Sequence, residues 1–183
     1  MEYIMIDAGH GPETAGKRSP DGTLREFTFN SAVAQTVKRL LVAEGVSVHF
    51  SHDPHRDVPL HERTSKANQL GVDAFVSIHA NAYGNSYNEA NGIETYVYPT
   101  GSRDSFLLAN IVQSSLISAV QRKDRGVKQA NFAVLRDTKM PAILVECGFM
   151  TNRTELMLLM NKAYREQCAR AIAFGILCYL YNK

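Results

Sequence analysis

Strand-like and helix-like segments alternate along this chain of 183 residues, and that alternation constrains its fold more than any other feature. Short apolar or alternating runs predict strands, and apolar residues at a spacing of three to four predict helices. Strands that alternate with helices favour a layered α/β domain. We therefore expect a single domain, residues 1–183, with a mostly parallel (mixed) twisted central sheet of about six strands flanked by helices.

The segments can be placed to within a few residues. The predicted strands are 3–7, 46–50, 73–79, 92–98, 132–135 and 142–146. The predicted helices are 29–41, 60–70, 105–120, a capped start at 151–155, and 164–181. The run from Ala142 to Val145 is continuously apolar, as is typical of a central strand that is buried on both faces.

Composition limits the classes of function. Hydrophobic residues make up 45% of the chain, enough for one sizeable core, and no run of 18 apolar residues suggests a membrane span. The formal net charge of +2, with both signs spread along the chain, argues against nucleic acid as a partner. The first residues, Met1–Asp7, predict a strand and carry no signal-peptide pattern.

Three polar residues follow strands of the predicted sheet. His10 follows the first strand, His79 closes the third, and Glu146 closes the apolar strand near 145. Ligands of an open α/β sheet gather beyond the carboxyl ends of its strands, so these side chains converge if the strands run parallel. Two imidazoles and a carboxylate are ligands that zinc uses in catalytic sites.

The residues alone leave alternatives open. A third metal ligand could be Glu13, Asp21 or Glu26 in the loop after the first strand, or could come from elsewhere. Cys147 is a rival thiol nucleophile, but alternation along a strand turns it away from Glu146. The other cysteines, Cys168 and Cys178, form no CxxC pair with it, and all three are expected to be buried small hydrophobes.

The remaining histidines are weaker candidates. His49 lies in the second predicted strand, and His52, His55 and His61 lie around a segment rich in Asp, Pro and Arg. Residues 51–57 predict a solvated turn.

Six blocks of sequence, in order, resemble one family. They are Ile6–Gly11, Arg25–Glu26, Ala67–Asn68, Ser77–Ala82, Gly92–Thr95 and Val145–Asn152. Together they resemble the zinc N-acetylmuramoyl-L-alanine amidases of the amidase 3 type, over nearly the whole chain. The resemblance implies one zinc per chain, with His10, Glu26 and His79 as its ligands, and Glu146 as the catalytic base.

The implied reaction is hydrolysis of the amide between N-acetylmuramic acid and L-alanine in peptidoglycan, by zinc-activated water with Glu146 as general base. Such an enzyme would act at the bacterial cell wall. Asn81, two residues beyond His79, is a candidate substrate contact, with an ordinary loop asparagine as the alternative. A zinc peptidase acting on the stem peptide and a catalytically dead wall-binding module are the competing functions.

The resemblance also bears on regulation. Related enzymes of Gram-negative envelopes carry an extra helix after the strand that matches 92–98, and that helix plugs the site until an activator displaces it. Here only residues 99–104 precede the next predicted helix. We therefore expect an open site and a monomer that works without an activator.

Overall fold

The structure is a computed structural model that describes residues 2–183. Its strands are β1 (Tyr3–Ala8), β2 (Ser47–Phe50), β3 (Ala74–Asn81), β4 (Ile93–Val97), β5 (Asp124–Gln129) and β6 (Ala142–Phe149). Its helices are α1 (Glu26–Ala43), α2 (Leu60–Leu70), α3 (Arg103–Val120), α4 (Ala133–Arg136), α5 (Arg153–Met160) and α6 (Lys162–Asn182). None of these helices combines the length and apolar character that crossing a bilayer requires.

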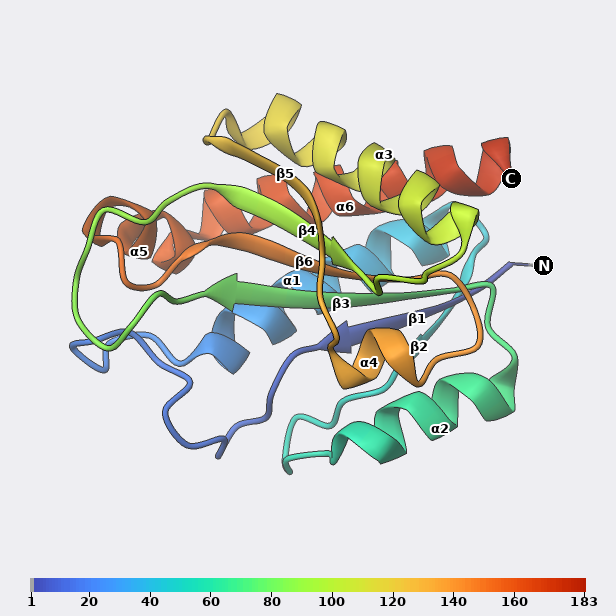
Figure 1. Cartoon of the computed structure of the whole chain (residues 1–183), viewed down its shortest axis with the longest axis horizontal. Coiled ribbons are helices and arrows are strands. Elements are labelled where there is room, and N and C mark those ends of the chain that lie inside the picture. The colour runs from blue at the N-terminus through green and yellow to red at the C-terminus, as the bar shows by residue number, and fades with distance from the viewer. Residues whose placement is uncertain (1) are drawn as a thin grey trace.

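One mixed sheet joins the six strands in the order β2-β1-β3-β6-β4-β5 (Figure 1). The four strands β2, β1, β3 and β6 run parallel to one another. Strand β4 is antiparallel to β6, and β5 is parallel to β4. The predicted architecture, a mostly parallel mixed sheet of about six strands flanked by helices, is therefore confirmed.

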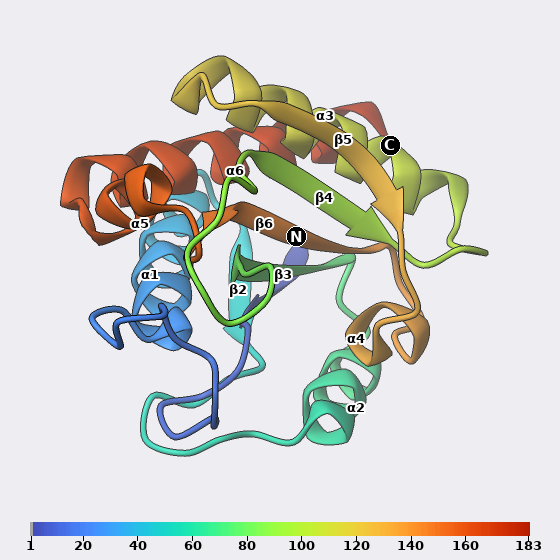
Figure 2. The same ribbon diagram turned by 60° about the vertical axis from the view of Figure 1, so that its left-hand side comes forward.

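Helices cover both faces of the sheet, as Figures 1 and 2 show. Helices α1, α3 and α6 pack against one face, where they enclose the larger apolar core. Helices α2 and α4 cover part of the other face, over a smaller cluster that includes Met5, Phe75 and Leu144. The rest of that second face, toward the carboxyl ends of β1, β3 and β6, holds the polar residues described below.

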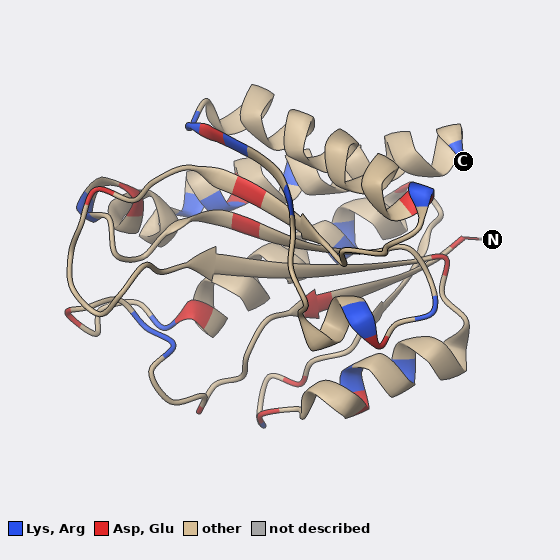
Figure 3. Ribbon diagram, in the orientation of Figure 1, with Lys and Arg blue, Asp and Glu red and all other residues tan. Residues whose placement is uncertain are grey.

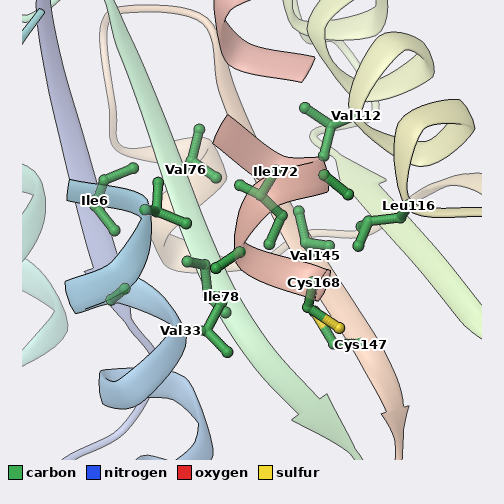
Figure 4. Packing of buried hydrophobic residues seen from close by; sticks show 14 of the residues in the cluster. Ile6, Val33, Val76, Ile78, Val112, Leu116, Val145, Cys147, Cys168 and Ile172 are labelled. Atoms are coloured by element: carbon green, nitrogen blue, oxygen red, sulfur yellow. The ribbon is translucent and has the colours of Figure 1, made fainter. Parts of the chain in front are cut away.

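The larger core sets which side chains face which layer. Alternate residues of the central strands, among them Ile6, Val76 and Val145, point into it (Figure 4). Cys147 continues this series and lies beside Cys168 of α6, and neither side chain is exposed to solvent. The expectation that Cys147 faces away from Glu146 is confirmed, so its thiol has no access to the other face.

The strand predicted at 132–135 is wrong. Residues 133–136 form the short helix α4, in which the amides of Leu135 and Arg136 donate to the carbonyl of Phe132. A four-residue apolar run fits a strand or a helical turn equally well by periodicity. Packing decides for the helix, since Val134 and Leu135 are buried in the smaller cluster.

The strand β5 was not predicted. Its sequence, Asp124–Gln129, has no apolar alternation, because it is an edge strand whose residues are only partly buried. Edge strands of natural sheets commonly carry charged residues. Pairing with β4 makes this polar segment the sixth strand.

Candidate active site

Three neighbouring parallel strands bring the predicted site residues together. His10 follows β1, while His79 of β3 and Glu146 of β6 are direct register partners. Register partners on adjacent strands project from the same face, and this face is the one that α2 and α4 cover only in part. The convergence expected from strand ends is therefore found in the fold.

Glu26 joins this group from the first turn of α1. Its Oε2 lies 3.1 Å from His10 Nε2, and its Oε1 lies 2.8 Å from His79 Nδ1. Burial alone would raise the pKa of Glu26, but the hydrogen bonds of His10 and His79 hold that pKa well below its usual value. The Asn30 amide also donates to Oε1 over 3.3 Å. Glu26 is thus a fixed, ionised carboxylate between two imidazoles.

The donor set fits a zinc ion. One ligand atom from each of His10, Glu26 and His79 lies within 4.8 Å of the others, in the one such group among the described residues. Tetrahedral zinc with bonds of about 2.0–2.1 Å keeps neighbouring ligand atoms about 3.3 Å apart. The two histidine–glutamate separations of 3.1 and 2.8 Å are close to that spacing.

Two backbone features shape the loop that carries His10. A Cβ at Gly9 would overlap the imidazole ring of His79, so only glycine allows the backbone just after β1 to approach that ring so closely. His10 itself has a φ of 64°, a left-handed conformation that is uncommon outside glycine. Arg63 of α2, 2% exposed, donates hydrogen bonds to the carbonyls of Ala8 and His10 and so braces this conformation.

Glu146 differs from Glu26 in having an unsatisfied oxygen. Its Oε2 is buried without any hydrogen-bond partner. Burial, reinforced by the negative charges of Glu26 and Glu94, raises the pKa of Glu146 to about 8. An unpartnered carboxylate with a pKa near neutrality is suited to accept and return a proton.

A cavity of about 630 Å³ opens beside these residues. His10, His79 and Glu146 line its polar side. Its apolar side comes from α2 and α4, from the residues just before each of these helices, and from β6, through Val58, Pro59, Leu60, Phe132, Ala133, Val134 and Leu144. A volume in this range accommodates a ligand of several chemical groups rather than a single ion.

Asn81, the predicted substrate contact, is engaged within the protein. Its Nδ2 donates to Glu94 Oε1 over 2.7 Å, and its Oδ1 accepts from the Ala82 amide over 2.8 Å. Glu94 also accepts from Tyr96 over 2.7 Å, and it is paired with Arg125 and Lys128 of β5. Asn81 therefore belongs to a network around a buried carboxylate.

Glu94 stands directly beside Glu146. The two are register partners on the antiparallel strands β4 and β6, where acidic residues appear on adjacent ribbons in Figure 3. Burial alone would raise the pKa of Glu94, but hydrogen bonds from Lys128, Arg125 and Tyr96 lower it to about 2. The two neighbouring carboxylates thus differ in pKa because one has four donors and the other has an unpartnered oxygen.

The segment 51–57, predicted to be a solvated turn, is only partly so. His55 and Asp57 are exposed, but Ser51 and His52 are buried. His52 Nδ1 accepts a hydrogen bond from the Ala8 amide over 3.0 Å. Burial lowers the pKa of His52 to about 4, so this imidazole is a neutral structural group behind β1.

Sequence reasoning missed two buried polar residues behind the candidate metal ligands, Asp7 and Ser77. Both are at most 1% exposed, and Asp7 pairs with the buried Arg63 over 2.8 Å. The available signal was a carboxylate and a hydroxyl inside otherwise apolar strands, where a polar group is costly unless it is hydrogen-bonded. Nothing in the sequence indicated which partners they have.

The sequence pattern of the family described as N-acetylmuramoyl-L-alanine amidase matches residues 4–178. The chain is 36% identical over 176 residues to the N-acetylmuramoyl-L-alanine amidase CwlM of Bacillus licheniformis, covering 96% of this chain and 68% of that protein.

Solved structures of N-acetylmuramoyl-L-alanine amidases have the same fold as this chain. A crystal structure of an N-acetylmuramoyl-L-alanine amidase from Clostridium difficile 630 superposes with a TM-score of 0.94 at 37% identity, covering 100% of this chain and 98% of the other. The catalytic domain of CwlV, an amidase of the same name from Bacillus (Paenibacillus) polymyxa var. colistinus, superposes with a TM-score of 0.91 at 35% identity and full coverage of both chains.

Proposed function

This chain belongs to the N-acetylmuramoyl-L-alanine amidase family, and we propose that it hydrolyses the muramoyl–L-alanine amide of peptidoglycan with a zinc ion held by His10, Glu26 and His79. The observation that supports the proposal is the three-residue donor cluster. It lies against the cavity that Glu146 lines. The apolar wall of that cavity offers contacts for the methyl and ring carbons of a muramoyl-peptide.

The chemistry divides between the ion and Glu146. Zinc, when bound, supplies a Lewis acid that polarises a carbonyl and lowers the pKa of water. Glu146, whose side chain lines the cavity, takes the proton of the attacking water. It then gives that proton to the alanine nitrogen as the carbon–nitrogen bond breaks, so the same carboxylate serves as base and then as acid.

Metal analysis tests the ligand assignment directly. His79→Ala removes one of three ligands, so the folded variant is expected to lose its zinc and its activity. His55→Ala is the matched control, because His55 is an exposed histidine outside the cluster. If His79→Ala keeps a full equivalent of zinc after dialysis, the assignment is wrong.

Digestion of purified peptidoglycan tests the reaction. An amidase leaves a free lactyl carboxyl group on muramic acid and a new amino terminus on L-alanine, and both products can be identified by mass spectrometry. A peptidase would instead create new termini within the stem peptide. A non-catalytic wall-binding module would release nothing, although it would still sediment with the wall.

The place of action and the assembly follow from the same proposal. Peptidoglycan as substrate places the enzyme at the bacterial cell wall. Residues 98–102 alone separate β4 from α3, so within the described chain no helix inserted there covers the cavity. We infer a monomer with an open site that works without an activator.

A further inference from the structure

A chain of hydrogen bonds runs from the buried carboxylate of Asp7 to the imidazole of His79. Ser77 Oγ donates to Asp7 Oδ2 over 2.6 Å, and His79 Nε2 lies 3.1 Å from the same Ser77 oxygen. Asp7 and Ser77 are register partners on β1 and β3, and Ser77 and His79 are two residues apart on β3. All three side chains therefore project from one face of the sheet.

The protons available on these groups determine which atom donates in each hydrogen bond. Asp7 is held as an anion: Arg63 donates to its Oδ1 over 2.8 Å, and Ser51 donates to the same oxygen over 2.6 Å. An ionised carboxylate only accepts, so the single hydroxyl proton of Ser77 points toward Asp7. Ser77 Oγ is then left with lone pairs for His79, and Nε2 must carry the proton that it donates.

We propose that Asp7 and Ser77 are positioning residues that keep a proton on His79 Nε2, so that metal binding displaces only the Nδ1 proton, which donates to Glu26 in the metal-free protein, and uses the lone pair there. Nδ1 is the ring nitrogen that faces Glu26 Oε1 at 2.8 Å. A metal-bound histidine is commonly oriented by a hydrogen bond from its other ring N–H to a carboxylate or a carbonyl. Here Ser77 accepts the hydrogen bond from His79, and Asp7 on the neighbouring strand β1 orients the Ser77 hydroxyl. The inference rests on the proposed zinc site.

Arg63 connects the same arrangement to the second histidine. Its guanidinium donates to Asp7, to the Ala8 carbonyl and to the carbonyl of His10. It also donates to the Val58 carbonyl over 2.9 Å, which anchors the group to the segment before α2. One buried ion pair thus orients His79 through Ser77 and holds the backbone of His10.

Two serines give a matched pair for the test. Ser77 and Ser51 are both buried, and each donates to Asp7 over 2.6 Å, but only Ser77 also contacts His79. We expect Ser77→Ala to weaken zinc binding about 10- to 100-fold, the usual effect of removing such a partner. Ser51→Ala is expected to stay within about threefold of the parent. Competition with a chromogenic chelator measures both affinities without any assay of activity.

Asp7→Asn provides a second variant with a sharper expectation. Arg63 and Ser51 both donate to Oδ1, so the asparagine oxygen takes that place and its NH₂ faces Ser77. The Ser77 hydroxyl then turns to donate to His79 Nε2, so the neutral imidazole keeps its single proton on Nδ1, where it blocks the metal. The expected loss of zinc affinity is at least as large as that of Ser77→Ala.

The tautomer can be observed in the unmodified protein, which keeps the proposal testable if a variant fails to fold. In zinc-loaded protein labelled with ¹⁵N-histidine, NMR should show His79 protonated at Nε2 and metallated at Nδ1. Metallation at Nε2 would overturn the proposal, as would equal zinc affinities for Ser77→Ala and Ser51→Ala. Failure of the parent protein to bind zinc at all would instead contradict the proposed function.

Discussion

Glu146 and His79 are register partners on the adjacent parallel strands β6 and β3, so a candidate base and a candidate metal ligand project side by side from the same face of the sheet. Their neighbours Asp7, Ser77 and Glu94 share that face through the same strand pairing. The site is therefore built on the rigid centre of the sheet, while only His10 and Glu26 come from the segments that follow β1.

Glu146→Gln should keep zinc and lose most of its turnover. The amide matches the size of the carboxylate but cannot take the proton from water, and removal of a general base commonly costs about 10²–10⁴-fold in rate. Muropeptide release per zinc-loaded molecule measures the effect. Turnover within about tenfold of the parent would remove Glu146 from the role of base.

Cys147→Ala is the control for that experiment on the adjacent residue. Its side chain lies in the core on the opposite face, beside Cys168. The small cavity should lower the free energy of unfolding by about 1 kcal/mol, with unchanged turnover per folded molecule. Loss of activity with zinc still bound would revive the thiol as a nucleophile.

Gly9→Ala should disturb the metal site without changing any ligand. The added Cβ would overlap the ring of His79 and push it away from Glu26. We expect zinc affinity to fall by about tenfold or more, as for other changes that reorient a ligand.

Gly16→Ala is the matched control in the same loop. It has a φ of 73° and nothing within 4 Å of the new Cβ, so it brings backbone strain of about 1 kcal/mol but no contact with a ligand. Chelator competition on both variants separates the two effects. Equal zinc affinities for Gly9→Ala and the parent would show that the ring of His79 can move without consequence.

Glu94→Gln should destabilise the protein in a pH-dependent way. The pKa of Glu94 is lowered from 4.5 to about 2 in the folded state, so its ionised form stabilises the fold above pH 4.5, and this contribution is lost as the pH falls toward 2. Because solvent partly screens the Arg125 and Lys128 charges, we expect the lost stability to be about 1–2 kcal/mol, less than the full pKa shift would give. Urea denaturation in the presence of a chelator should show a gap between variant and parent at pH 7 that narrows below pH 4.5.

Glu62→Gln is the control for the charge itself. Glu62 pairs with Arg56 on the surface, where both side chains are largely exposed, and such pairs contribute about 0–1 kcal/mol. A comparable gap for Glu62→Gln and Glu94→Gln at pH 7 would contradict the importance of the buried network.

The isolated protein should clear suspensions of purified cell walls without any added partner. The cavity beside Glu146 is not covered by a helix between β4 and α3, since only residues 98–102 join them. A turbidity assay with zinc-loaded protein measures clearing, and Glu146→Gln is the inactive control. No clearing on several wall types until an activator is added would contradict the open-site proposal.

The sequence by itself determined the layered α/β class and the convergence of His10, His79 and Glu146. Both rest on local patterns: apolar periodicity marks the strands, and parallel strands bring their carboxyl ends to one edge. Glu26 as the third member came only from the family resemblance, because its loop offered Glu13 and Asp21 as equal candidates.

Tertiary structure decided what depends on distant contacts. Residues 133–136 became a helix because Val134 and Leu135 pack into a cluster with α2, and the polar strand β5 exists because β4 offers it an edge. The partners of Asp7 and Glu94 likewise come from other strands and helices. A sequence shows that a buried carboxylate needs hydrogen-bond donors, but only the folded chain shows which donors reach it.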